Sequence, residues 1–268
     1  MNASTKGGAR AGHAVEGGPD GNFVAAIARP GAGQLRIQPF MQHCLVTDQP
    51  AGLMVQLYAG SEQGCAVAQA AHRLGLDSLA FYRGVIEVLA MLSRLKARGV
   101  HLPCTIAVPE QVLCEAQLVP RLCAWVHRYG LEEGLLTLEI ESVLTGLLTR
   151  QGIHRQLRKL CDAGFNVSCT GVDAVGAALM AGRWRRCLQI KVPAGELLGI
   201  GVGRLSQKIA KKLGVAVVAE HISEADQVPA LVAMGIQYGQ GSLFAIPEQI
   251  AAELPQPQSS YMNVISFK

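Results

Sequence analysis

Four side chains that could bind a metal ion lie in or directly after β-like runs. Glu139 and Glu141 occupy alternate positions of one run, so in a strand they point to the same face. Glu220 follows a second run, and Gln240 lies in a third. Carboxylate and amide oxygens suit hard divalent cations such as Mg²⁺ or Mn²⁺. Metal binding is therefore the chemistry that these residue types could support.

The same residues also have structural interpretations. Glu220 could be retained at a strand end by hydrogen bonds to backbone or water. Gln240 and Gly241 could serve a turn and a close approach of two backbone segments. Glu139 and Glu141 could cap the following helix or face solvent, which is the interpretation that we favour for them.

The composition is that of a folded protein with an aliphatic core. Of the 268 residues, 50% are hydrophobic and 16% are charged, which suits one large α/β domain or two small ones. A net charge of +4 is only mildly basic, so direct DNA binding is not expected. The eight cysteines show no CxxC pair and no zinc spacing, and together with the absence of a membrane-length apolar run or a signal core they predict a cytoplasmic protein.

Alternating short and long apolar patterns predict repeated strand–helix units. Residues 1–33 are rich in glycine and alanine and are expected to form a flexible tail, followed by a domain over 34–252 and a C-terminal tail over 253–268. Within the domain, β-like runs such as 104–108, 166–169 and 187–192 alternate with segments of helical spacing. The clearest helical segment is 78–98, and another covers 203–213. Seven or eight such units favour an α/β fold with a mostly parallel sheet closed into a TIM-like (βα)8 barrel.

The C-terminal third carries the most specific motif. Val217 to Ile222 is followed at set steps by Gln227, Leu231, Gly235, the segment 240–244 and Pro247. This pattern resembles the end of the EAL domain family, with its AEGVE segment, its QG pair and its proline. The resemblance continues upstream in the same order over residues 34–250, through the stretches Gln38–Pro39, Thr105–Val112, Leu138–Leu144 and Leu188–Lys191.

The resemblance implies a particular barrel and a particular reaction. The family's fold is a TIM-like barrel in which one strand runs antiparallel to its neighbours. Its activity is hydrolysis of cyclic di-GMP to a linear dinucleotide with two divalent cations. The ligands of those cations would lie at the C-terminal ends of the barrel strands.

Most positions that match the family's metal-binding or phosphate-binding residues have changed. Met54 stands where the family has the signature glutamate, and a thioether is a poor ligand for Mg²⁺. Lys191 stands at an aspartate position, which reverses the charge. The other altered positions are Tyr58, Ile106, Thr170, Gly171, Gln189 and Ser223.

Four residues form the remnant of the family's site. Glu220 and Gln240 match directly, and Glu141 matches within the EITES segment. The first glutamate of that segment falls on Leu138 unless one residue was deleted, in which case Glu139 takes its place. No catalytic residue, metal or cofactor is therefore expected.

Three functions remain open at this point. The favoured one is a degenerate, non-catalytic EAL-like domain that regulates cyclic-di-GMP-type signalling by binding a regulatory protein, such as a transcription or motility regulator. The second is a receptor that binds cyclic di-GMP without hydrolysis. The third is a weakly active phosphodiesterase with rearranged ligands, which alone would require Mg²⁺ or Mn²⁺. A homodimer is compatible with all three.

Overall fold

The structure is a computed structural model that describes residues 35–59, 62–63, 65–141, 151–170, 188–199, 208, 212 and 214–252. The two expected tails, 1–33 and 253–268, lie outside these residues, as does Gly171.

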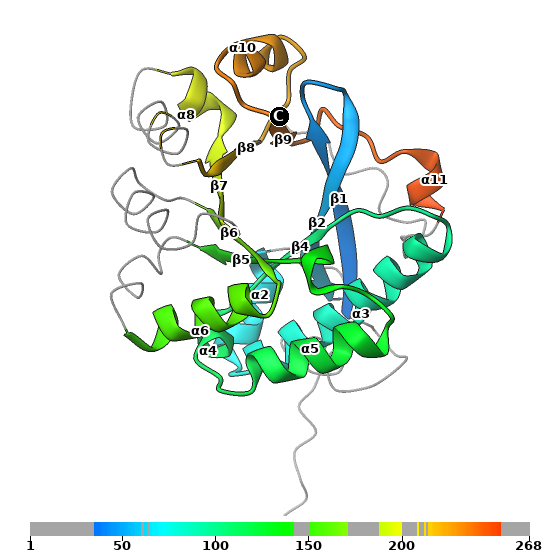
Figure 1. The fold of residues 1–268 in the computed structure, drawn as a ribbon, viewed down its shortest axis with the longest axis vertical. Coiled ribbons are helices and arrows are strands. Elements are labelled where there is room, and N and C mark those ends of the chain that lie inside the picture. The colour runs from blue at the N-terminus through cyan, green and yellow to red at the C-terminus, as the bar shows by residue number, and fades with distance from the viewer. Residues whose placement is uncertain are drawn as a thin grey trace, which may run out of the picture.

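Eight strands close into a barrel, which Figure 1 shows nearly end-on. A short ninth strand pairs only with the outer part of β2. All neighbours in the ring are parallel except β1, which runs antiparallel to both β2 and β9. This is the predicted TIM-like barrel with one reversed strand. The strands are β1 (Leu35–Cys44), β2 (Gln49–Ala59), β3 (Glu62–Gln63), β4 (Cys104–Ala107), β5 (Leu136–Glu141), β6 (Asn166–Thr170), β7 (Leu188–Pro193), β8 (Ala216–Glu220) and β9 (Tyr238–Gln240).

Helices cover the outside of the ring (Figure 1). The predicted helix over 203–213 lies almost wholly outside the described residues. Among the helices that the structure describes, none combines the length and apolarity needed to cross a bilayer. The helices are α2 (Cys65–Arg73), α3 (Asp77–Ala97), α4 (Glu110–Leu113), α5 (Leu118–Arg128), α6 (Gln151–Asp162), α8 (Ala194–Leu198), α10 (Gln227–Ala233) and α11 (Glu248–Ala251), with a 3-10 turn at Glu133–Leu135.

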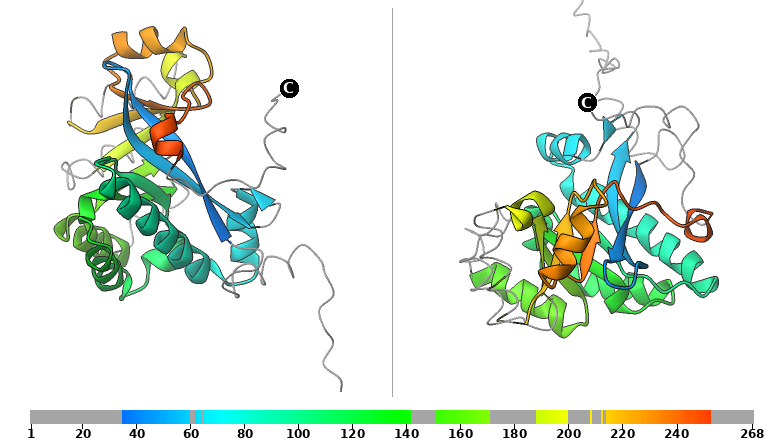
Figure 2. Two further views of the ribbon diagram at one scale, coloured as in Figure 1. Left: turned by 90° about the vertical axis from the view of Figure 1, so that its right-hand side faces the viewer. Right: turned by 90° about the horizontal axis from the view of Figure 1, so that it is seen from above.

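The β1–β2 hairpin extends beyond the part of it that pairs with the neighbouring strands of the ring. β2 pairs with β4 only through Leu53–Val55, whereas its pairing with β1 continues to Leu35 and Ala59. The two side views in Figure 2 show this hairpin running past the rest of the barrel toward α2. The outer half of β2, including Tyr58, is thereby carried away from the ring.

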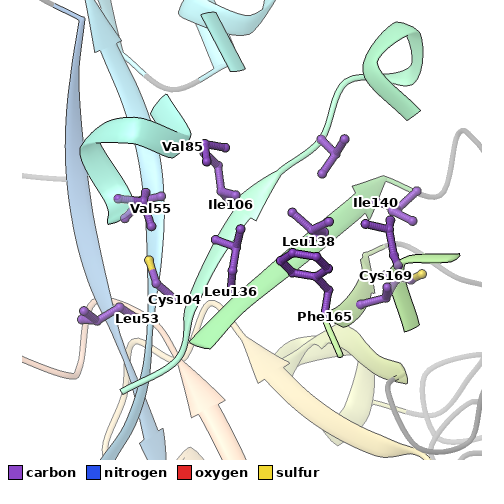
Figure 3. Packing of buried hydrophobic residues seen from close by; sticks show 14 of the residues in the cluster. Leu53, Val55, Val85, Cys104, Ile106, Leu136, Leu138, Ile140, Phe165 and Cys169 are labelled. Carbon is purple, nitrogen blue, oxygen red and sulfur yellow. The ribbon is translucent and has the colours of Figure 1, made fainter. Parts of the chain in front are cut away.

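Side chains on the outer face of the barrel are apolar and pack under the helices. A Cβ added to Gly84 of α3 would lie 3.3 Å from Ile106 Cδ1, so Ile106 faces this helix. Partners in register share a face, which places Val55 and Leu138 on the same side as Ile106. Figure 3 shows these side chains with Val85 of α3 in one hydrophobic cluster. Their burial provides much of the apolar driving force for the fold.

The inner face of the barrel is polar instead. Of the nine polar residues that are buried in the described part of the chain, seven lie on strands at inward-facing positions. A barrel interior is normally packed with branched apolar side chains. A polar interior therefore marks the lumen as the place to look for a site. The seven residues are Gln42, Thr105, Thr137, Glu139, Ser168, Lys191 and Gln240.

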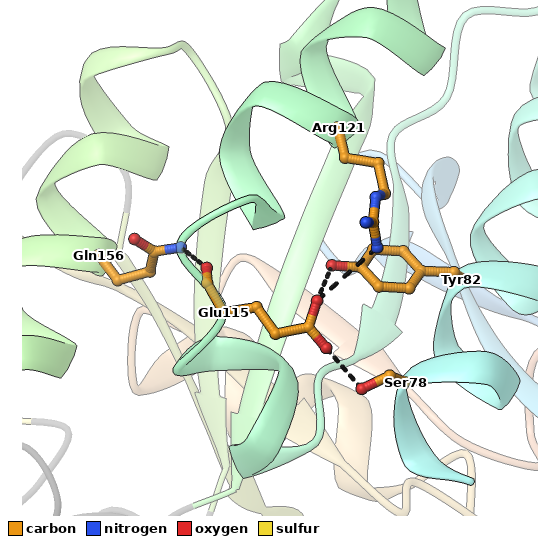
Figure 4. A network of polar contacts seen from close by, with 5 residues as sticks. All are labelled: Ser78, Tyr82, Glu115, Arg121 and Gln156. Carbon is orange, nitrogen blue, oxygen red and sulfur yellow. Dashed lines mark hydrogen bonds and ion pairs between the residues drawn. The ribbon is translucent and has the colours of Figure 1, made fainter.

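A second polar cluster lies outside the barrel and ties α3 to the segment that follows α4 (Figure 4). The Glu115 carboxylate accepts hydrogen bonds from Ser78 Oγ at 2.5 Å and from the Tyr82 hydroxyl at 2.6 Å. Arg121 lies 3.7 Å from the same carboxylate and 4.4 Å over the Tyr82 ring. Gln156 of α6 donates to the Glu115 carbonyl at 2.7 Å. Burial, helped by the Glu115 hydrogen bond, raises the pKa of Tyr82 above its usual value.

Replacing Glu115 with alanine is expected to lower the free energy of unfolding by about 1–3 kcal/mol, because the hydroxyls of Ser78 and Tyr82 lose their charged acceptor. Glu87→Ala on the exposed face of α3 is the matched control and should change stability by less than about 0.5 kcal/mol. Urea denaturation of both variants measures the difference. Equal stabilities would show that this cluster contributes nothing.

Candidate functional site

The centre of the site is an ion pair across three neighbouring strands. Lys191 Nζ of β7 contacts Glu139 Oε2 of β5, and the side chains are 1% and 11% exposed. Ser168 of β6, the strand between them, donates a long hydrogen bond of 3.5 Å to the same carboxylate oxygen. All three side chains point inward: Glu139 and Ser168 are register partners, and Lys191 is two residues beyond Gln189, the partner of Ser168, and so takes the same face. The lumen thus holds a buried charge pair close to the C-terminal ends of these strands.

Next to this pair lies a second carboxylate with an amide partner. The Gln240 amide nitrogen is 2.9 Å from Glu220 Oε1 and 3.4 Å from Met54 Sδ. Gln240 lies on β9, Glu220 on β8 and Met54 on β2. Through Gln240, the polar contacts in the lumen therefore extend from β8 to β2. The amide of Gln240 acts here as a donor, and the thioether of Met54 as a weak acceptor.

The Lys191–Glu139 ion pair and the Glu220 carboxylate interact electrostatically. Burial raises the pKa of Glu220 above its usual value, the Lys191 ammonium opposes this effect, and the Glu139 carboxylate adds to it. Smaller lowering effects come from His221 and from the Gln240 hydrogen bond. His221 has a φ of 59°, in the left-handed region, at the position of the glycine in the resembled AEGVE motif. The chain therefore turns sharply directly after Glu220.

The strand register distinguishes the two alignments of the EITES-like segment. Leu138 faces outward into the hydrophobic core, whereas Glu139 faces inward and binds Lys191. Glu139 is thus the glutamate that the fold directs into the site. By the same criterion, Ile106 faces α3 and is not part of the lumen, while its neighbour Thr105 points inward. A shift of one residue in a strand reverses the face of every side chain.

The remaining expected positions are not all brought together. Gln189 and Thr170 face inward in register with Ser168 and Lys191, respectively, and both are half-buried. Glu141 shares the face of Glu139 but is exposed at the end of β5. Ser223 is exposed on the turn after β8, where its backbone N–H donates to Gln227 Oε1 at 3.0 Å. Tyr58 is half-buried on the outer part of β2, opposite Arg36.

The sequence pattern did not single out Ser168, Thr105, Thr137 or Gln42, although all four are buried in the lumen. Their signal was present as polar residues at every second position of otherwise apolar strands. Within the described ranges, no group of three or more histidine, cysteine, aspartate or glutamate residues is placed to hold a metal ion. The inward-facing polar groups are an ammonium, the carboxylates of Glu139, Glu220 and the exposed Glu141, amides, hydroxyls and a thioether.

Solved structures with the same fold carry the EAL name. The FimX EAL domain superposes with a TM-score of 0.68 at 18% identity, covering 87% of this chain and 97% of that one. The EAL enzyme Bd1971, bound to cAMP and cyclic di-GMP, has a TM-score of 0.65 at 14% identity over 81% of this chain. BlrP1 of Klebsiella pneumoniae, in a calcium and cyclic di-GMP complex, has a TM-score of 0.66 at 17% identity over 82% of this chain. The chain spans only 63% of Bd1971 and 56% of BlrP1.

At these identities the structural matches establish the fold. No curated protein sequence matches the chain well enough to count as a relative. The profile of the EAL domain family, however, matches residues 33–247, which is most of the chain. The chain therefore belongs to the EAL domain family.

Proposed function

We propose that this EAL domain is a non-catalytic regulatory domain of cyclic-di-GMP signalling that acts by binding another protein. One observation carries the proposal: the inward-facing lysine Lys191 forms an ion pair with Glu139, the one glutamate that is buried in the described part of the chain. A cation-dependent hydrolase needs those oxygens free for metal.

The other lumen residues support the same proposal. Two divalent cations held close together require several hard oxygen ligands of negative charge. The inner face offers Glu139, Glu220 and the exposed Glu141, while Met54 contributes sulfur. A fixed positive charge among these groups disfavours a second and third positive charge nearby.

The scaffold around this altered site is intact. The ring of strands is closed, and Gly241 still allows the close contact between the segments after β8 and β9. A domain that keeps the barrel but not the catalytic residues can still offer a surface for protein binding, because a fold does not determine an activity. This is why protein binding is proposed in preference to catalysis.

Co-purification of the tagged full chain from its native host tests the protein-binding part of the proposal. We expect one regulatory protein to be retained through mild washing, to bind the purified chain directly, and to be retained equally by the Glu220→Gln variant. A chain that elutes alone, or a candidate that fails to bind in purified form, would contradict the proposal.

A receptor that binds cyclic di-GMP without hydrolysis is the second candidate, since related structures are complexes with this dinucleotide. Calorimetry with cyclic di-GMP, with and without Mn²⁺, distinguishes it from the first. Our proposal predicts no heat of binding at high micromolar ligand. A saturable heat in the absence of metal would favour the receptor function.

A further inference from the structure

The protein itself supplies one positive charge to the lumen, the side chain of Lys191. Lys191 is the only lysine or arginine among the residues that are buried in the described part of the chain. Its side chain is 1% exposed and points inward from β7. Burying an ammonium without a partner is strongly unfavourable, so this lysine must be stabilised by its immediate surroundings.

The Glu139 carboxylate provides that stabilisation. Glu139 from β5 contacts the ammonium directly, and Ser168 from the intervening strand donates to the same oxygen. Glu220 stands on β8, the strand on the other side of β7, where its register partner is Pro193, two residues beyond Lys191. The ammonium thus contacts Glu139 directly, and Glu220 is the acidic residue on the adjacent strand.

The residues around Lys191 do not fit the metal pair that the fold family implies. An ion bound by Glu139 would have to displace the ammonium that already contacts this carboxylate. Glu220 accepts a hydrogen bond from the amide nitrogen of Gln240, so this amide presents its donor atom, not its oxygen, to the carboxylate. The nearest atom on the β2 side is the sulfur of Met54, a soft ligand.

We propose that the Lys191 ammonium is a built-in cation that takes the electrostatic place of a divalent ion. It balances the buried carboxylate of Glu139, lies beside the half-buried carboxylate of Glu220, links β7 to β5 at the site, and excludes Mg²⁺ and Mn²⁺ from it. This inference rests on the proposed function, because both concern the same site. It adds that the positive charge at this site comes from Lys191.

Manganese binding to the wild type and to charge variants of Lys191 tests the proposal. The free Mn²⁺ signal in electron paramagnetic resonance, and the melting temperature with Mn²⁺ or EDTA, are measured for each protein. For the wild type we expect no loss of free Mn²⁺ and no change of Tm. For Lys191→Asp, which removes the ammonium and adds a carboxylate, we expect Mn²⁺ uptake and a rise in Tm of about 5 °C at saturating ion.

Two further variants keep the result interpretable. Lys191→Gln tests the same idea if Lys191→Asp does not fold, because freeing the two glutamates should also permit Mn²⁺ uptake. Adding Glu139→Gln to either variant should abolish uptake, which shows that the ion binds at this site. The exposed Lys212→Asp is the charge-matched control and should bind no Mn²⁺.

Two results would overturn the inference: Mn²⁺ binding by the wild type, or folded Lys191 variants that take up none. The second result would leave the proposed function standing, because the site would still lack metal. Hydrolysis of cyclic di-GMP by the wild type would instead remove the proposed function. The two failures are therefore distinguishable.

Discussion

Replacing Lys191 with methionine is expected to lower the free energy of unfolding by about 3–5 kcal/mol. Methionine has a similar length and packs well, so the loss reflects charge more than volume. The substitution leaves the Glu139 carboxylate buried with only the weak hydrogen bond from Ser168. An uncompensated charge in such a place is among the most destabilising changes that a single substitution can make.

The double variant Lys191→Met/Glu139→Gln separates the charge from the packing. Replacing both partners of a buried ion pair with neutral side chains is often nearly neutral, so we expect it to regain most of the lost stability. Urea denaturation of the wild type, both single variants and the double variant gives the coupling energy. Lys212→Met on the exposed surface is the control and should change stability by less than about 0.5 kcal/mol. Additive losses in the double variant would contradict an interaction between the two charges.

Gly241→Ala is expected to be comparably destabilising, for a steric reason. A Cβ at this position would lie 2.1 Å from the carbonyl oxygen of Ile222 and 2.4 Å from its nitrogen. These are backbone atoms in a fixed segment, because Ile222 N–H donates to the Gln240 carbonyl and Leu243 N–H donates to the Ile222 carbonyl, both at 3.1 Å. The clash can be relieved only by separating the segments after β8 and β9.

We expect Gly241→Ala to cost about 3 kcal/mol or more in unfolding free energy, or to prevent folding. Gly195→Ala is the matched control, because a Cβ there would meet nothing within 4 Å and alanine favours the helix α8. Thermal unfolding followed by circular dichroism compares the two. A Gly241→Ala variant that melts with the wild type would mean that this close contact is absent in solution.

Much of the barrel was predictable from the sequence. Runs such as 104–108, 166–169 and 187–192 are short, apolar and separated by helical segments, and each one forms a strand within a residue or two of its expected ends. The reversed direction of β1 could not be predicted from this pattern, because strand direction leaves no mark on hydrophobic periodicity. It was implied only by the family resemblance.

The sequence identified several residues of the site, but it did not predict which of them are in contact. Glu139, Lys191, Glu220 and Gln240 were each singled out, but nothing in the sequence indicated that Lys191 reaches Glu139. That contact depends on the registers of β5, β6 and β7, which spacing along the chain does not specify. Ile106 was expected at a metal-binding position for the same reason, since a match by sequence steps does not determine which face a side chain takes.

The central claim, a site that holds its own cation and does no chemistry, is tested most directly with cyclic di-GMP itself. The purified chain is incubated overnight with the dinucleotide and Mn²⁺, and linear product is separated by chromatography. We expect no product above that of the Glu139→Gln/Glu220→Gln variant. Product that forms with the wild type and disappears in that variant would contradict it.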